Sequence, residues 1–172
     1  PVPIKGMGRF THEAVAIDPR SGIAYQTEDE GNGLIYRFKP TVKGALHKGG
    51  VLQAMVFKSK ASMDTRNWKK PNVMKKELYD IEWITLQDTD NPENDLRFRG
   101  HEAGAAIFAR GEGMWYSRDS IYFDKAAKFW PFSGGTRRTV TKRQCGEAAD
   151  ATETYLNVRK NMHMHAHSTC DV

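Results

Sequence analysis

Charged side chains gather beside turns at four places in this chain, and their types suggest metal and phosphate chemistry. The four places are residues 9–13, 27–30, 88–93 and 110–113. Hard cations such as calcium bind where several carboxylate and carbonyl oxygens converge on one point. An arginine presents a rigid fork of N–H donors that can hold a phosphate through two hydrogen bonds. If these loops meet in space, the residues predict a cation site next to an anion-binding arginine.

Four carboxylates and one arginine are the candidates for such a site. The carboxylates are Glu13, Glu28, Asp29 and Glu112, and the arginine that would hold phosphate is Arg110. They would meet if their loops lay around the axis of a β-propeller. The alternative is that residues 28–30 form a solvated acidic turn with no ligand.

Other motifs indicate less. Residues 88–93 look like a calcium loop, but Pro92 and the missing glycine break the EF-hand pattern, so we interpret them as a turn. The segment His163-Met-His-Ala-His167 could hold a soft metal, although a His-rich terminal segment is more often disordered. The sequence has no P-loop, no Gly-x-Ser-x-Gly and no His-Glu-x-x-His motif.

The composition is that of an ordinary globular chain and allows one domain. Of the 172 residues, 39% are hydrophobic and 27% are charged. The longest apolar run, residues 103–109, is much shorter than the roughly 20 residues of a membrane-spanning helix. The chain starts at Pro1 without an apolar signal segment, so we expect a processed chain or a piece of a longer one.

The net charge of +5 is unevenly distributed. Residues 58–76 are basic and residues 77–95 are acidic, and the basic run holds a single aromatic residue, Trp68. Nucleic-acid binders usually interleave basic and aromatic side chains, so we interpret these runs as solvated loops and expect no nucleic-acid partner. Cys145 and Cys170 fit no zinc spacing and could form one disulfide or none.

The elements that must position the candidate residues are short strands. Alternating or β-prone segments between turn signals predict strands at residues 14–17, 23–27, 34–38, 51–57 and 79–86. His12-Glu13-Ala14 recurs as His101-Glu102-Ala103 about 90 positions later, a spacing that fits two propeller blades. The pattern predicts an all-β fold, a partial β-propeller whose antiparallel blades comprise residues 12–57 and 79–123.

The C-terminal part differs in pattern. Apolar positions become rare over residues 124–172, and the order of acidic and then basic residues over 146–160 favours one helix. We therefore expect a β-propeller fragment over residues 1–123 and a divergent tail over 124–172, helical near 146–160 or disordered.

The motifs in order along the chain resemble the PhoX alkaline phosphatase family over roughly residues 6–123. The resemblance rests on Gly-Arg-Phe-Thr-His-Glu-Ala, Thr-Glu-Asp and Arg-Gly-Glu-Gly, within residues 8–14, 18–29, 33–40, 49–54, 82–84 and 108–116. It implies a β-propeller phosphomonoesterase that is periplasmic or secreted, acts on phosphomonoesters, and needs no membrane or nucleic-acid partner.

The resemblance also implies cofactors and residue roles. Calcium and iron would lie on the propeller axis, with Glu13, Glu28, Asp29 and Glu112 as metal ligands and Arg110 on the phosphate. Family members carry a cysteine on the iron, whereas no cysteine precedes Cys145 here. We therefore expect a fragment with an incomplete metal site, and the rest of the propeller upstream and downstream. The alternatives are a non-catalytic calcium-binding propeller piece and a lactonase-like propeller hydrolase.

Overall fold

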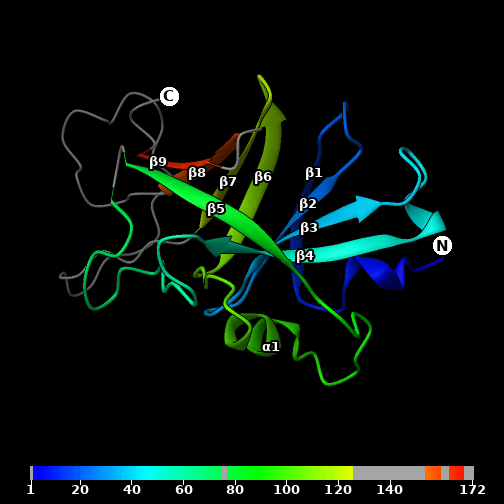
Figure 1. Ribbon diagram of the computed structural model, residues 1–172, viewed down its shortest axis with the longest axis horizontal. Helices are drawn as coiled ribbons and strands as arrows, with labels where there is room; N and C mark the ends of the chain where they lie inside the picture. Colours follow the sequence, from blue (N-terminus) through cyan, green and yellow to red (C-terminus); the bar gives the residue numbers. More distant parts are fainter. Residues whose placement is uncertain (1, 75–76, 126–153, 160–162, 169–172) are drawn as a thin grey trace, which may run out of the picture.

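The chain forms an antiparallel sheet of nine strands across the residues that the structure describes (Figure 1). The structure is a computed structural model, and it describes residues 2–74, 77–125, 154–159 and 163–168. The strand order is β1-β2-β3-β4-β5-β9-β8-β7-β6. The strands are β1 (His12–Ile17), β2 (Ala24–Glu28), β3 (Ile35–Pro40), β4 (Gly50–Phe57), β5 (Leu78–Thr85), β6 (Gly111–Ser117), β7 (Ser120–Lys125), β8 (Thr154–Arg159) and β9 (His163–Ser168).

Strands β1 to β4 form the first blade as an up-and-down meander, which confirms the predicted all-β, partial β-propeller fold. The turn between β1 and β2 shows why the chain reverses there. The Asp18 carboxylate accepts hydrogen bonds from the Arg20 amide and the Ser21 hydroxyl, and Gly22 takes a positive φ of 75° that favours glycine. Turn signals and alternation were sufficient to locate these four strands.

The second blade consists of β6 to β9, so the boundaries predicted for it, residues 79–123, are wrong. Strand β5 pairs with the outer strand of the first blade, through Ile81↔Phe57 to Thr85↔Gln53. Its first residues, Leu78 to Asp80, pair with β9. Strand β5 thus joins the two blades at their outer strands, while β6 packs beside β1 at the inner side. The repeated His-Glu-Ala triplet has no structural meaning, because one copy lies in β1 and the other at the end of a helix.

The C-terminal segment adds two strands, β8 where the sequence predicted a helix and β9 in the His-rich segment that we expected to be disordered. Residues 154–159 are strand β8, paired with β7 from Ser120↔Arg159 to Lys125↔Thr154. The β-prone residues of this segment and the ladder offered by β7 outweigh the helix-dipole preference of the charges, which is worth only a few tenths of a kcal/mol. The remainder of the predicted helix, residues 146–153, and both cysteines lie outside the described residues.

Apolar side chains fill both sides of the first blade. One cluster includes Tyr36, Phe38 and Leu52, and it is covered by the 3-10 turn η1 (Lys5–Met7) and by the helix α1 (Leu96–Glu102). The other cluster includes Phe57 of the first blade and Phe108 and Phe123 towards the second, and it holds the two blades together. A second short turn, η2 (Leu46–Lys48), connects β3 and β4.

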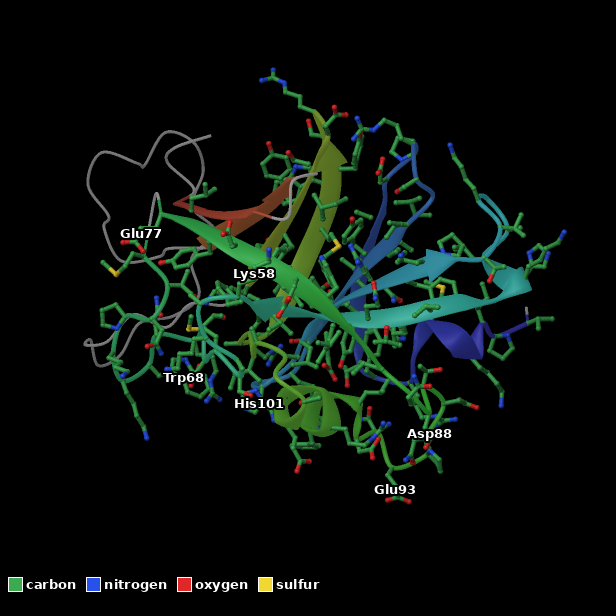
Figure 2. The ribbon with its side chains drawn as sticks, in the orientation of Figure 1. Lys58, Trp68, Glu77, Asp88, Glu93 and His101 are labelled. Atoms are coloured by element: carbon green, nitrogen blue, oxygen red, sulfur yellow. The ribbon has the colours of Figure 1, made fainter. Side chains whose placement is uncertain are left out.

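The described part of the basic run, residues 58–74, precedes β5 without forming a named strand or helix, whereas the acidic run, residues 77–95, contains β5 itself and the loop that follows it, so the expectation that it is a loop is wrong for β5. Figure 2 shows Lys58 and Trp68 in the segment that precedes β5, and Asp88 and Glu93 in the segment that follows it. Asp90 in the acidic segment pairs with Lys5 at 2.7 Å, so this loop also fixes the N-terminal turn. Among the described residues, the helices are all too short or too polar to cross a membrane.

Candidate functional site

The strands that carry or adjoin the candidate residues, β1, β2 and β6, pack against one another. The hydroxyl of Thr27 accepts a hydrogen bond from the amide of Ala14 at 3.0 Å and donates one to the carbonyl of Glu112 at 2.7 Å. Thr27 is fully buried. The Thr27 hydroxyl therefore holds Ala14, the neighbour of Glu13, and Glu112 close to each other. Two of the predicted site residues, Glu13 and Glu112, thus lie on strands that pack side by side.

Gly111 explains how β6 comes so close to β2. A Cβ atom at position 111 would lie 3.0 Å from the carbonyl oxygen of Glu28 and 3.0 Å from the Cβ of Thr27. Only glycine fits this contact without displacing the backbone of β2. The glycine between Arg110 and Glu112 is thus what allows both side chains to lie beside the end of β2.

Arg110 lies at the centre of the site. Its backbone has a φ of 49°, in the left-handed region, and its amide donates to the carbonyl of Glu30 at 2.8 Å. Its guanidinium donates to both carboxylate oxygens of Asp29, from Nε to Oδ1 and from Nη2 to Oδ2, the latter at 2.9 Å. The Glu112 carboxylate lies 3.8 Å from the same Nη2. Asp29 raises the pKa of Arg110, so the guanidinium remains a cation.

Glu28 points away from this group. Its carboxylate is buried and accepts hydrogen bonds from the amide of Leu34 at 3.0 Å and the hydroxyl of Tyr36 at 2.8 Å. The Arg97 guanidinium of α1 lies 3.6 Å from its other oxygen. Burial raises the pKa of Glu28 to about 7, and this effect outweighs the hydrogen bonds and Arg97, which lower it. Neighbouring residues of an extended chain face opposite sides, so Glu28 is directed inward while Asp29 is directed to Arg110.

The remaining predicted ligand, Glu13, is exposed on β1. Thr11 and Glu30, which the sequence analysis did not select, belong to the same region. The Thr11 hydroxyl donates to the Glu30 carboxylate at 2.9 Å, and the Thr11 carbonyl accepts from the Asp29 amide at 2.9 Å. The sequence could have indicated both residues, because Thr11 directly precedes His12 and Glu30 directly follows Asp29.

These carboxylates do not form a metal site as they are placed. Among the residues that the structure describes, no three His, Cys, Asp or Glu side chains lie close enough together to hold an ion. The Asp29 carboxylate is bound by Arg110, and Glu28 is bound by Tyr36 on the opposite side. The donor set therefore does not fit calcium or iron. What the site presents is an arginine held between two carboxylates.

Comparisons with known proteins agree with this architecture. A family profile described as "Alkaline phosphatase PhoX" matches residues 1–160, beyond the residue 123 expected from the sequence. The chain is also similar to a solved structure, PhoX of Pseudomonas fluorescens in complex with vanadate, a transition state analogue. The TM-score is 0.60 at 15% identity, and the alignment covers 96% of this chain and 32% of that chain. The chain thus spans about a third of the length of that structure. No curated protein matches it.

Proposed function

Since this chain belongs to the alkaline phosphatase PhoX family, we propose that it carries the phosphate-binding part of a phosphomonoester hydrolase. The observation that supports the proposal is the placement of Arg110. A guanidinium that is 54% exposed is held rigidly by Asp29 at the junction of the two blades. Such a preorganised cation stabilises the negative charge on a transferring phosphoryl group.

The orientation of the guanidinium leaves one side for a ligand. Asp29 occupies the edge formed by Nε and Nη2. Within the part of the chain that the structure describes, Nη1 makes no hydrogen bond. The side of the guanidinium that carries Nη1 can therefore donate to phosphate oxygens. Asp29 is then a positioning residue that orients Arg110, a different role from the metal ligand that the resemblance implies.

Phosphatases of this family depend on metal ions, and the resemblance implies calcium and iron with Glu13, Glu28, Asp29 and Glu112 as ligands. Because the described carboxylates do not converge, we derive no step through a metal. The proposal is that this chain binds the phosphoryl group of phosphomonoesters in the periplasm or outside the cell. Alone it should hydrolyse them poorly or not at all, because phosphoryl transfer needs every metal ligand fixed in place.

The test is to measure phosphate binding and hydrolysis separately. Inorganic phosphate should bind the wild-type chain, and Arg110→Ala should abolish the binding, whereas Arg110→Lys should weaken it because an ammonium lacks the fork. Arg20→Ala is the matched control, since Arg20 is also an exposed arginine paired with two carboxylates, Asp18 and Asp119. In a protein that contains this chain and turns over p-nitrophenyl phosphate, Arg110→Ala should lower turnover about 10²–10³-fold. Unchanged binding and turnover in Arg110→Ala would overturn the proposal.

A further inference from the structure

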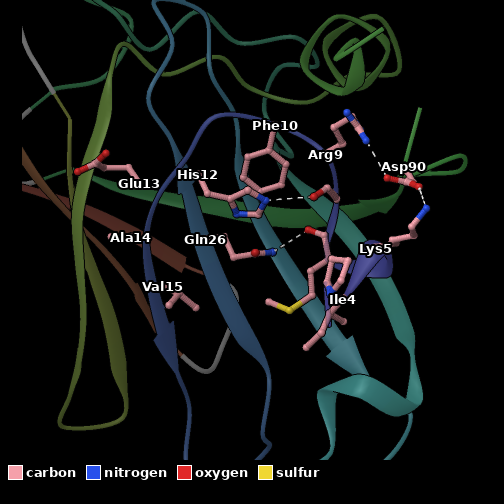
Figure 3. A pocket seen from close by; sticks show the side chains of 13 residues that line it. Ile4, Lys5, Arg9, Phe10, His12, Glu13, Ala14, Val15, Gln26 and Asp90 are labelled. Carbon is pink, nitrogen blue, oxygen red and sulfur yellow. Dashed lines mark hydrogen bonds and ion pairs between the residues drawn. The ribbon is translucent and has the colours of Figure 1, made fainter. Parts of the chain in front are cut away.

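A cleft of about 580 Å³ lies between strand β1 and the N-terminal turn η1 (Figure 3). It is of the size that small-molecule sites commonly have. Its floor is apolar, with Ile4, Met7 and Val15, and Val15 is 55% exposed. The site described above uses none of these residues.

An aromatic stack forms one wall of the cleft. The rings of Phe10 and His12 are stacked with centroids 3.7 Å apart and an interplanar angle of 23°. Phe10 stacks in turn on the buried Tyr36 at 4.2 Å, and His12 Nε2 lies 3.1 Å from the carbonyl of Gly8. These contacts hold the His12 face in place before any ligand binds.

The charged side chains that line the cleft balance one another, two cations (Lys5 and Arg9) against two carboxylates (Asp90 and Glu13), and this decides the kind of ligand that fits inside. Lys5 and Arg9 both pair with Asp90, at 2.7 Å and 3.5 Å. The Gln26 side chain is buried, and one of the two N–H donors of its amide is used by the carbonyl of Met7 at 3.2 Å. With its charges balanced and one amide donor used, the cleft suits an uncharged apolar or aromatic group better than a second anion.

Strand β1 connects the cleft to the Arg110 region. Glu13 and Ala14 line the cleft, and Figure 3 shows Glu13 on its β6 side. The Ala14 amide bonds to Thr27, whose hydroxyl bonds to Glu112, two residues after Arg110. The strand that lines the cleft is thus bonded, through Thr27, to the strand that follows Arg110.

We propose that this cleft receives the organic part of the substrate, and that the preferred substrates are phosphomonoesters of flat aromatic or apolar alcohols. The inference rests on the proposed function for the position of the phosphate. The exposed face of His12, which Phe10 supports from behind, would stack on the ring, and Val15 and Met7 would contact its edge. These three residues are then specificity determinants for the ester group.

The test compares two non-hydrolysable phosphonates by calorimetry on the whole chain. Phenylphosphonate should bind about tenfold more tightly than methylphosphonate, as expected for burying a small apolar group. Val15→Asp should remove this preference while leaving methylphosphonate affinity unchanged. Val51→Asp is the matched control, since Val51 is similarly exposed, at 44%, and does not line the cleft. Equal affinities for the two phosphonates, or a preference that survives Val15→Asp, would overturn the inference.

A second probe separates this inference from the proposed function. Phenol has no phosphate, so its binding does not need Arg110, and it should shift the amide NMR resonances of Phe10, His12 and Val15 in wild type and in Arg110→Ala alike. If phenol binds there but neither phosphonate does, Arg110 does not bind phosphate, whereas the proposal that the cleft binds an aromatic group is supported. If phenol leaves these resonances unmoved, the cleft is not an aromatic-binding site.

Discussion

The Thr27 hydroxyl on β2 and the Glu112 carbonyl on β6 are joined by a hydrogen bond of 2.7 Å between residues 85 positions apart in the sequence. Thr27 also accepts from Ala14 on β1, so one buried side chain joins the inner strands of both blades. Within the described residues, the sheet ladder connects these blades at their outer strands, through β5. The hydrogen bonds of Thr27, together with the bond from the Arg110 amide to the Glu30 carbonyl, therefore help to set the position of Arg110 relative to Asp29.

Replacing Thr27 by valine should destabilise the chain by about 1–3 kcal/mol. Valine has nearly the same shape, but it removes the hydroxyl that bonds to the part-buried Ala14 amide and Glu112 carbonyl. Thr27→Ser should restore most of the stability, because it keeps the hydroxyl. Urea unfolding measures both. Thr85→Val is the control, since the Thr85 hydroxyl only accepts an exposed 3.3 Å bond from Gln53; if both valine variants lose equal stability, the special role of Thr27 is refuted.

Replacing Gly111 by alanine should both destabilise the chain and weaken phosphate binding. The new methyl group would lie 3.0 Å from backbone and Cβ atoms of β2, so β6 must move away and carry Arg110 with it. Gly31→Ala is the matched control, because a Cβ at Gly31 would meet nothing within 4 Å. Phosphate affinity and the urea midpoint should fall for Gly111→Ala only. A Gly111→Ala variant with native phosphate affinity would contradict this account of the Arg-Gly-Glu-Gly motif.

The buried Lys125 should make the stability of the chain depend on pH. Its ammonium donates to the carbonyl of Thr65 and is 3% exposed, and burial lowers its pKa from 10.5 to about 8. Between these two values the unfolded chain binds more protons than the folded chain, so stability rises with pH. From pH 8 to pH 10 the contribution is about 2 kcal/mol.

Urea unfolding at several pH values measures this effect. Lys125→Met should flatten the rise between pH 8 and pH 10, whatever its stability at pH 7. Lys58→Met, at an exposed position, should retain the rise of the wild type. Equal slopes in all three proteins would show that Lys125 keeps an ordinary pKa in the folded state.

Local sequence patterns were sufficient to predict the strands of the first blade, but they were insufficient to predict those of the second blade. Strands β1 to β4 alternate and are separated by turn residues such as Asp18 and Gly22, so neighbours in sequence are neighbours in the sheet. Strand β5 has the same local pattern, but its partners are set by contacts distant in sequence, with β4 on one side and β9 on the other. Helix α1 has only seven residues, too few for a helical period to be recognised.

The sequence predicted which residues belong to the site, but it did not predict how their side chains are oriented. The motifs placed Arg110, Asp29 and Glu112 in one region, and the structure brings these three together. The orientation of Glu28 depends on Tyr36 and Arg97, which adjoin it only after folding. Sequence types alone also did not show that Arg110 would occupy the space between the carboxylates.

Removing Arg110 should convert this region into a calcium site. In the wild type the guanidinium pairs with Asp29 and lies 3.8 Å from Glu112, so a second cation is repelled and millimolar calcium should change the melting temperature little. In Arg110→Ala the guanidinium is absent, while Asp29, Glu112 and the nearby Glu30 keep their negative charges. A hard divalent ion can then take the place of the guanidinium. Because calcium would bind only the folded chain, it should raise the melting temperature of this variant by about 2–4 °C. Chelator should reverse the shift, and the double variant Asp29→Asn with Arg110→Ala should abolish it. A calcium response as large in the wild type as in Arg110→Ala would show that the carboxylates bind the ion without displacing the arginine.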